Sequence, residues 1–359
     1  MSCHKGVKTL RMPLLSVFTP LWQKNCKNKP QMKIHLKACS RILPGSAILS
    51  EDLEIKSRLA QGWAEKNTGV QSRHWANPAD NITSIAAAAL HQALDEAEMT
   101  CAELDLLLFA GASFDHPIPH NACLIKQVLD QNGADFPCFD VDATCLSFLH
   151  ALDIAHLYLQ HRGLKRVAIV SAEIPSRALN PADAKTYTLF GDAAVAVILE
   201  ANDEEGYLPA PAYFINQSAG AQLAIVPTGG SKRRGSEPNT DPNSFFFQMN
   251  GRQLITMTLR YLDDFLVKLE QQTAQSLQRY DYIVPHQASK FGNEYFMQRY
   301  SLTEDQVMNT LNVHGNCVSA SIPLGLYELY AQNKLQKGKD VLLIGTAAGL
   351  SIGALRLKF

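Results

Sequence analysis

The feature that most constrains the fold is an alternation of apolar strands and amphipathic helices from Met32 to Phe359. Such alternation predicts an α/β architecture, in which helices cover the faces of a largely parallel sheet. The order β-α-β-α-β-α-β-β occurs twice. The expected strands are 32–43, 104–111, 137–143, 166–173 and 193–201, then 207–217, 280–286, 309–314, 339–345 and 351–359. The expected helices are 80–97, 121–130 and 145–162, then 250–272, 289–300 and 319–334.

Local sequence supports an internal duplication. FGDAAVAVIL (190–199) lies between the last two strands of the first copy, as IGTAAGLSIGAL (344–355) does in the second. VDATCLSFLHAL (141–152) and VHGNCVSASIPLGL (313–326) each follow a strand and open a helix. A repeated unit of this size indicates two similar halves that pack against each other.

The first 31 residues differ from the rest. They contain Lys and Arg but no acidic residue, and the apolar stretch MPLLSVFTPLW is interrupted by Pro13 and Pro20. A secretory signal needs an unbroken apolar region and a small-residue cleavage site, which this segment lacks. We therefore expect a poorly ordered extension at 1–31, a first half at 32–205 and a second half at 206–359.

Charge and cysteine content exclude several classes of protein. Lys and Arg total 33 and Asp and Glu 34, so a net charge of −1 gives no general attraction to nucleic acid or to a membrane surface. No apolar run reaches the roughly 18 residues of a membrane span. The eight cysteines form no CxxC pair and no zinc-type cluster. Reduced thiols, no metal and a cytoplasmic location are expected.

Cys145 is the candidate nucleophile. It follows the predicted strand 137–143 and opens the predicted helix 145–162. A helix N-terminus carries partial positive charge, so we expect a lowered thiol pKa and a reactive thiolate. A buried structural cysteine is the alternative, and only the place of Cys145 at a strand–helix junction distinguishes it from the other cysteines.

His286 and Asn316 lie at comparable junctions in the second half. His286 ends strand 280–286, where an imidazole can exchange a proton or donate to a developing oxyanion. Asn316 lies in HGNC, where an amide can donate N–H groups to a negative oxygen. A surface histidine and an N-cap asparagine are the alternatives. In parallel α/β sheets, ligands bind at the carboxyl ends of strands, so the three junctions can converge.

The closing turn GTAAGLSIG (345–353) provides the fourth element. We expect the backbone N–H of Ala348 to form an oxyanion hole with the N–H of Cys145. A nucleotide-binding loop is the alternative, but the chain has neither GxGxxG after a first strand nor GxxxxGK[ST]. The order Cys, His, Asn also describes papain-like proteases. Their CG[SA]C[WY] signature is absent, because the chain reads TCLSFL at Cys145.

From Met32 to Phe359, the chain resembles the thiolase superfamily and, within it, β-ketoacyl-acyl carrier protein (ACP) synthase III. The segments that carry the resemblance occur in the family's order and are TGVQSRH, DVDATCLSF, FGDAA, VPHQAS, HGNCVSASIPLGL and GLSIGALRL. The resemblance implies a layered α-β-α-β-α thiolase fold and a homodimer.

The resemblance also implies a two-step reaction. An acyl-CoA acylates Cys145, and malonyl-ACP then enters the same tunnel and loses CO2. His286 and Asn316 stabilise the resulting enolate, which attacks the Cys145 thioester to initiate fatty acid synthesis. No metal or organic cofactor is implied, because the thioester itself acidifies the α-carbon. A thiolase would need a second cysteine in the closing turn, which has none.

Several residues depart from the family pattern. Ser147 replaces a glycine two positions after the nucleophile, and Ser289 replaces the usual Asn after PHQA. Ile118 stands where short-chain enzymes carry an aromatic gate, which implies an acyl pocket with room for longer chains. These departures leave open an alternative function, a condensing enzyme of secondary metabolism that makes a long-chain ketone or a resorcinol-type product. A non-catalytic partner subunit is the third hypothesis.

The resemblance also implies CoA contacts. Trp63 and Arg177 match the positions that sandwich the adenine, a pairing that stacking and cation–π attraction favour. Lys290 and Arg299 are candidates for phosphate or carrier-protein contacts, as is the basic run 232–234. A solvated flexible loop is the alternative interpretation of that run.

Overall fold

The computed structural model describes residues 32–130, 133–238 and 240–359. Residues from Met32 to Phe359 form one compact unit, and the expected extension 1–31 lies outside the described residues. Within these ranges, no helix is both long enough and apolar enough to cross a lipid bilayer.

The first sheet comes from the first half of the unit. Its strands occur in the order β1-β7-β6-β4-β5, with β4 parallel to β5 and β6, and β7 antiparallel to β1 and β6. The strands are β1 (Lys33–Ile42), β4 (Leu106–Ala110), β5 (Cys138–Val141), β6 (Arg166–Glu173) and β7 (Ala193–Asn202). Every residue of β4 is buried, because helices cover both faces of this sheet.

The second sheet repeats this arrangement with residues of the second half. Its order is β12-β13-β14-β8, and β9 also pairs with β14. The strands are β8 (Leu208–Pro209), β9 (Tyr213–Asn216), β12 (Tyr282–Pro285), β13 (Asp340–Ala347) and β14 (Ser351–Lys358). Here β12 is parallel to β13, whereas β13 and β14 form an antiparallel hairpin.

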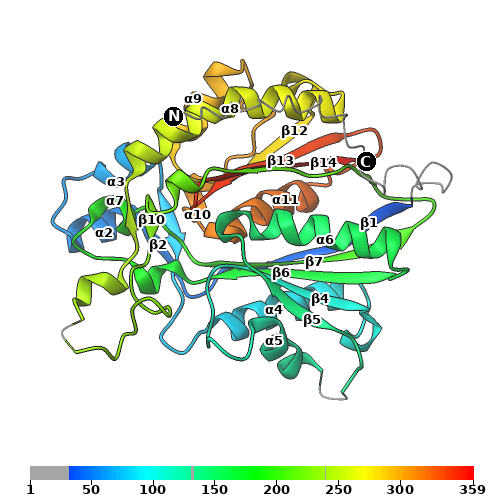
Figure 1. The fold of residues 1–359 in the computed structure, drawn as a ribbon, viewed down its shortest axis with the longest axis horizontal. Coiled ribbons are helices and arrows are strands. Elements are labelled where there is room, and N and C mark those ends of the chain that lie inside the picture. The colour runs from blue at the N-terminus through cyan, green and yellow to red at the C-terminus, as the bar shows by residue number, and fades with distance from the viewer. Residues whose placement is uncertain (1–31, 131–132, 239) are drawn as a thin grey trace, which may run out of the picture. The chain divides into compact units, whose positions relative to one another are not determined.

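Five layers result, as Figure 1 shows, and the α-β-α-β-α thiolase fold is confirmed. Helices α6 (Ser147–His161) and α11 (Ser321–Ala331) lie between the two sheets and share the largest apolar core with them. Helices α4 (Ile82–Glu96) and α5 (Asn121–Leu129) cover the outer face of the first sheet. Helices α8 (Gly251–Thr273) and α9 (Lys290–Arg299) cover the outer face of the second. The predicted helices therefore lie where the duplication requires them.

One predicted strand is wrong. The segment expected as strand 309–314 contains the short helix α10 (Leu311–His314), and the pairing beside β12 is reduced to one bridge between Ile283 and Val307. The physical reason is the side chain of Asn309, whose Oδ1 accepts the N–H of Leu311 at 3.1 Å and turns the chain away from the sheet.

Several short elements lie outside the repeat and were not predicted as helices or strands. They are β2 (Ala47–Leu49), α2 (Ser50–Lys56), α3 (Trp63–Thr68), β3 (Ser72–His74), α7 (Ala184–Tyr187), β10 (Ala224–Ile225) and β11 (Gln248–Met249). Elements of two to seven residues carry too little periodicity to be recognised from sequence.

Candidate active site

The backbone around Cys145 forms a tight elbow between β5 and α6. Cys145 lies in the one-turn 3-10 helix η2 (Thr144–Leu146), where Thr144 has a φ of 52°. The Asp142 side chain accepts the Thr144 N–H at 2.9 Å. The Ser147 hydroxyl accepts the Ala143 N–H at 2.9 Å and donates to the Thr144 carbonyl at 2.6 Å. Ser147, a departure from the family pattern, therefore helps to close the elbow.

The second half contains a corresponding elbow, which repeats two of these hydrogen bonds. The Asn316 side chain accepts the Val318 N–H at 2.9 Å, Val318 has a φ of 50°, and the Ser321 hydroxyl accepts the Cys317 N–H at 2.9 Å. The one-turn helix η7 (Val318–Ala320) then leads into α11. In this register Asn316 corresponds to Asp142, and Ser319 corresponds to Cys145.

The amide of Asn316 has a fixed orientation. The backbone N–H of Asn316 donates to the Leu189 carbonyl at 2.9 Å, and the backbone carbonyl of Asn316 accepts the Gly191 N–H at 3.1 Å. Because the side-chain oxygen accepts the Val318 N–H, the NH2 group is the part of this buried amide left to donate to a ligand. Asn316 therefore caps the turn before η7, as the N-cap interpretation expects, and its side-chain NH2 is held in place as a hydrogen-bond donor.

His286 lies on the other side of the Cys145 elbow. It follows β12, and its N–H donates to the Ile344 carbonyl of β13 at 2.8 Å. A Cβ on Gly345 would lie 2.7 Å from the Cβ of His286 and 3.1 Å from Cδ2 of Leu146, so the residue after Cys145 and His286 both border Gly345. Only glycine permits this approach.

His286 is 6 % exposed, and its ring nitrogen Nδ1 is buried without a hydrogen-bond partner. Burial lowers the pKa of His286 to about 4, because the charged imidazolium would lose its hydration. The imidazole is therefore neutral at pH 7, with one ring nitrogen able to donate and the other able to accept.

The expectation of a lowered thiol pKa at Cys145 is wrong. Burial raises the pKa to about 12, and the negative charge of Glu173 adds to the increase. The N–H groups of Ala348 and Cys145, together with the Thr144 hydroxyl, act in the opposite direction but are outweighed. The helix proper begins only at Ser147, after the 3-10 turn, so its partial positive charge does not dominate at the sulfur. Cys145 rests as a thiol.

The closing turn 345–353 lies beside the Cys145 sulfur, because the N–H of Ala348 acts on it. The backbone N–H groups of Ala348 and of Cys145 itself both favour the thiolate form of the Cys145 sulfur and lower its pKa. The oxyanion hole expected from these two N–H groups stays a prediction.

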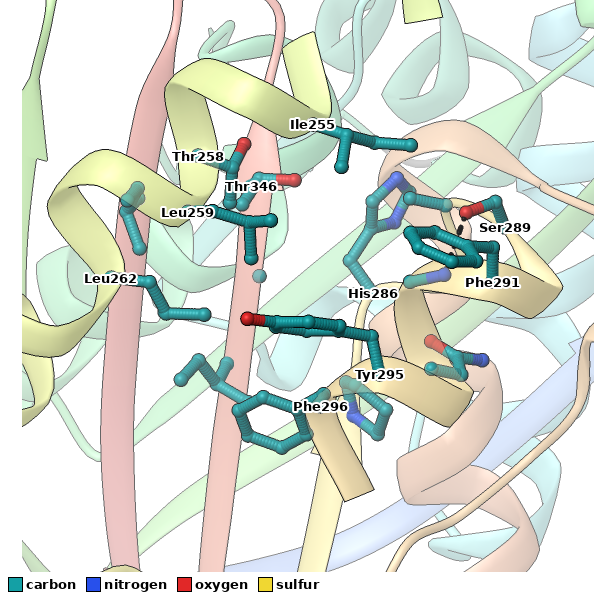
Figure 2. Close-up of a pocket in the computed structure, with 17 residues that line it drawn as sticks. Ile255, Thr258, Leu259, Leu262, His286, Ser289, Phe291, Tyr295, Phe296 and Thr346 are labelled. Atoms are coloured by element: carbon teal, nitrogen blue, oxygen red, sulfur yellow. Dashed lines mark hydrogen bonds between the residues drawn. The ribbon is translucent and has the colours of Figure 1, made fainter. Parts of the chain in front are cut away.

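An apolar pocket of about 780 Å³, part of it open to solvent, reaches His286 from the surface. Figure 2 shows Leu259 and Leu262 of α8 on one side and Phe291 and Tyr295 of α9 on the other, with His286 at the edge. The hydroxyl of Ser289 accepts the Gly292 N–H as the N-cap of α9, and Nδ1 of His286 has no hydrogen-bond partner, so Ser289 does not orient the imidazole through Nδ1.

The residues expected to contact CoA or the carrier do not line the pocket beside His286. Trp63 is half-buried at the start of α3, a helix that contacts α9. The Arg177 guanidinium is exposed and donates to the backbone carbonyls of residues 77 and 80. Nζ of Lys290 lies 3.9 Å from Oε1 of Glu294, so the two side chains form an ion pair.

Two further residues do not take their predicted positions: Arg299, expected to contact phosphate or the carrier, and Ile118, expected to line the acyl pocket. Arg299 is bound by the carboxylate of Asp263. Ile118 is 86 % exposed in the loop between β4 and α5, and it is not among the residues that line the pocket beside His286. The structure of one chain therefore does not bring Ile118 to this pocket.

Sequence reasoning missed Glu173 and Ser319. Glu173, at the end of β6, is fully buried and accepts a hydrogen bond from the Ser319 hydroxyl at 2.6 Å. A signal for Ser319 was present, because aligning the two halves so that Asn316 meets Asp142 pairs Ser319 with Cys145.

Comparison with known proteins agrees with this geometry. Residues 139–213 match the family profile of 3-oxoacyl-[acyl-carrier-protein] synthase III, and residues 271–359 match that of its C-terminal part. β-Ketoacyl-[acyl-carrier-protein] synthase III of Neisseria meningitidis serogroup B is 30% identical over 318 residues, which are 88% of this chain and 96% of the relative. The enzyme of the same name from Coxiella burnetii is 29% identical over 317 residues, with the same shares.

A solved structure gives the same result. The crystal structure of 3-oxoacyl-[acyl-carrier-protein] synthase III from Aquifex aeolicus VF5 superposes with a TM-score of 0.80 at 26% identity. The match covers 91% of this chain and 100% of that one.

Proposed function

Since the chain belongs to the β-ketoacyl-ACP synthase III family of condensing acyltransferases, we propose that it joins an acyl group from acyl-CoA to malonyl-ACP with loss of CO2. The single observation that carries this proposal is the set of groups around the Cys145 elbow. A thiol, a neutral imidazole, a fixed amide and two backbone N–H groups suit acyl transfer followed by enolate formation.

In the first step, the Cys145 sulfur attacks the carbonyl of the acyl-CoA thioester. The sulfur must lose its proton as it attacks, because the resting group is a thiol, and neutral His286 is the base that we assign to this task. The N–H groups of Cys145 and Ala348 hold the tetrahedral oxyanion. The bond to the CoA sulfur then breaks, and that sulfur takes the proton.

In the second step, malonyl-ACP loses CO2, and its thioester oxygen becomes the oxygen of an enolate. An N–H of His286 and the NH2 of Asn316 donate to that oxygen, while the carbanion carbon attacks the Cys145 thioester. Collapse of the tetrahedral adduct releases β-ketoacyl-ACP, and the departing Cys145 sulfur takes one proton from water, which restores the thiol. The route needs no redox cofactor, because the substrates are neither oxidised nor reduced by an outside partner, and it assigns stabilisation of the enolate to His286 and Asn316 rather than to a metal.

The pocket beside His286 supports entry of a thioester arm from the surface, with Trp63, Arg177 and Lys290 proposed as contacts for CoA or the carrier. We also propose a cytoplasmic homodimer. Exposed Phe114 and Ile118, at 58 % and 86 %, lie near the edge strand β5 and favour a covered surface there. In such a dimer Ile118 could reach an acyl pocket across the interface.

The test is product formation from malonyl-ACP and acyl-CoAs of about two to about twelve carbons, a range that spans short and medium acyl chains. We expect β-ketoacyl-ACP and one CO2 per turnover, with neither product from Cys145→Ala. Full condensation by that variant would refute the proposal. Long-chain ketones or cyclised products would instead support the secondary-metabolism alternative, which the two relatives above do not favour.

A further inference from the structure

The backbone of Asn316 is held by a short segment of the first half, residues 188–192. The N–H of Asn316 donates to the Leu189 carbonyl at 2.9 Å, and the Gly191 N–H donates to the Asn316 carbonyl at 3.1 Å. These two bonds form a parallel bridge between Asn316 and Phe190. Both backbone hydrogen-bonding groups of Asn316 are therefore bound to this segment, and the place of the side-chain NH2 depends on where the segment lies.

The 188–192 segment and the turn before Asn316 pack backbone against backbone. A Cβ on Gly191 would lie 2.1 Å from the His314 carbonyl oxygen. A Cβ on Gly315, whose φ is 71°, would lie 2.5 Å from the Leu189 carbonyl oxygen. Only glycine permits these two approaches. Since no side chain lies between them to absorb a shift, a displacement of the segment moves Asn316 as well.

Arg73, in β3, holds the other side of this segment. The Arg73 side chain is fully buried, and its Nη2 donates to the Thr188 carbonyl at 2.6 Å and to the Ser50 hydroxyl at 2.9 Å. Its Nη1 donates to the Ile48 carbonyl at 3.3 Å. A guanidinium carries five N–H donors in a fixed planar fork, so one side chain can bind the carbonyls of two separate segments. Arg73 therefore links the 188–192 segment to β2 and to the start of α2.

The residues after Arg73 continue the same attachment. Nε1 of Trp75 donates to the Phe190 carbonyl at 3.0 Å, and the Asp192 N–H donates to the His74 carbonyl at 2.8 Å. The first, third and fifth residues of the segment thus bind residues 73–75, while the second and fourth bind Asn316. Backbone groups of successive residues point to opposite sides of an extended chain, which explains the alternation. The segment transmits the position of one side to the other.

We propose that Arg73 is a positioning residue for the carbon–carbon bond-forming step, in which it fixes the 188–192 segment and, through it, the Asn316 NH2 that meets the enolate oxygen. The acylation step does not use Asn316. His286, which serves that step, is attached elsewhere, because its N–H donates to the Ile344 carbonyl at 2.8 Å. Loss of Arg73 therefore slows condensation and spares acylation. This inference rests on the proposed function of Asn316 in condensation.

The test measures the two steps separately. The enzyme is loaded with saturating acyl-CoA, the acyl group on Cys145 is quantified by intact mass, and malonyl-ACP is then added for a single turnover. Arg73→Met keeps an unbranched side chain and removes the donors. We expect its second step to slow about 100-fold, the effect of a displacement of about 1 Å, while acylation stays within about threefold of wild type. Arg73→Lys keeps the charge and one donor, so it should recover about tenfold of that loss.

Two further variants separate positioning from general destabilisation. Leu90→Ala is the matched control, because Leu90 is fully buried in α4 on the outer face of the first sheet. It should lower the melting temperature and leave the ratio of the two rates unchanged. Trp75→Phe keeps an aromatic ring and removes the bond to the Phe190 carbonyl. It carries the test if Arg73→Met does not fold, and its second step should slow about fivefold.

A double variant shows whether Arg73 acts through Asn316. In an Asn316→Ala background, Arg73→Met should slow the second step by no more than about threefold further, because the group that it positions is gone. Additive losses, equal slowing of both steps by Arg73→Met, an unchanged second step in Trp75→Phe, or the same change of ratio in Leu90→Ala would overturn the proposal. If the acylated wild-type enzyme does not condense at all, the proposed function fails instead, so the two failures are distinguishable.

Discussion

Gly345→Ala tests whether the approach of His286 to the Cys145 elbow is required. The new Cβ would lie 2.7 Å from the Cβ of His286, 3.1 Å from Cδ2 of Leu146 and 3.2 Å from Cδ1 of Ile322. Carbon atoms pack at about 3.5–4.0 Å, so His286 must move by about 1 Å. Its backbone N–H is held by Ile344 at 2.8 Å, and it cannot retreat without breaking the pairing of β12 and β13.

Two effects follow from this crowding. Overpacking of this kind costs about 1–3 kcal/mol of the free energy of unfolding. A displacement of about 1 Å in a group that positions the reacting atoms costs about 100-fold in rate. We expect condensation to fall about 100-fold in an assay of CO2 release, while thermal melting falls only modestly and circular dichroism is unchanged.

Gly230→Ala is the matched control. A Cβ at this exposed glycine would meet no atom within 4 Å, so both activity and melting should stay at wild-type values. Condensation by Gly345→Ala within about threefold of wild type would refute the reasoning, because His286 would then tolerate the displacement.

Three further predictions follow from the site and core. Burial lowers the pKa values of His156, His286 and His314 to about 3, 4 and 4. Each pKa is below its value in the unfolded chain, so the free energy of unfolding is full above about pH 6.5 and falls as the pH approaches 4. The loss is up to about 3 kcal/mol per histidine. A melting temperature that stays constant over this pH range would contradict the burial argument. Asn316→Asp keeps the acceptor for the Val318 N–H but replaces the donor with a negative charge. It should lower condensation about 100-fold and leave acylation of Cys145 measurable by intact mass; equal loss of both steps would argue against an enolate-specific role. Ser147→Ala removes two hydrogen bonds of the elbow and should cost about 1–3 kcal/mol in chemical denaturation, whereas an unchanged midpoint would show that the elbow closes without them.

The sequence supports prediction of the long, periodic elements and the order of the two halves. Helices 80–97 and 250–272 appear as α4 and α8 with ends shifted by one or two residues, because their apolar periodicity spans several turns. The segment 309–314 fails as a strand because a local side-chain hydrogen bond from Asn309 decides its conformation.

The candidate site could likewise be predicted only in part. Cys145 and His286 could be selected because each follows a strand, whereas Asn316 was selected after a predicted strand that the structure replaces with α10. The two elbows meet through contacts between η2 and η7. The protonation state of Cys145 could not be predicted, because it depends on burial and on Glu173, a residue separated from it by the whole of α6. Sequence position indicated a helix N-terminus, whereas the structure has a 3-10 turn with a positive φ at Thr144.

The most direct test of the central claim is the site of acylation. The enzyme should be incubated with acyl-CoA alone, digested and mapped by mass spectrometry, since Cys145 competes with the exposed thiol of Cys123 and the buried thiol of Cys317. We predict one acyl group per chain, on Cys145. An acyl group on another residue, or none in an enzyme that still condenses, would contradict the account.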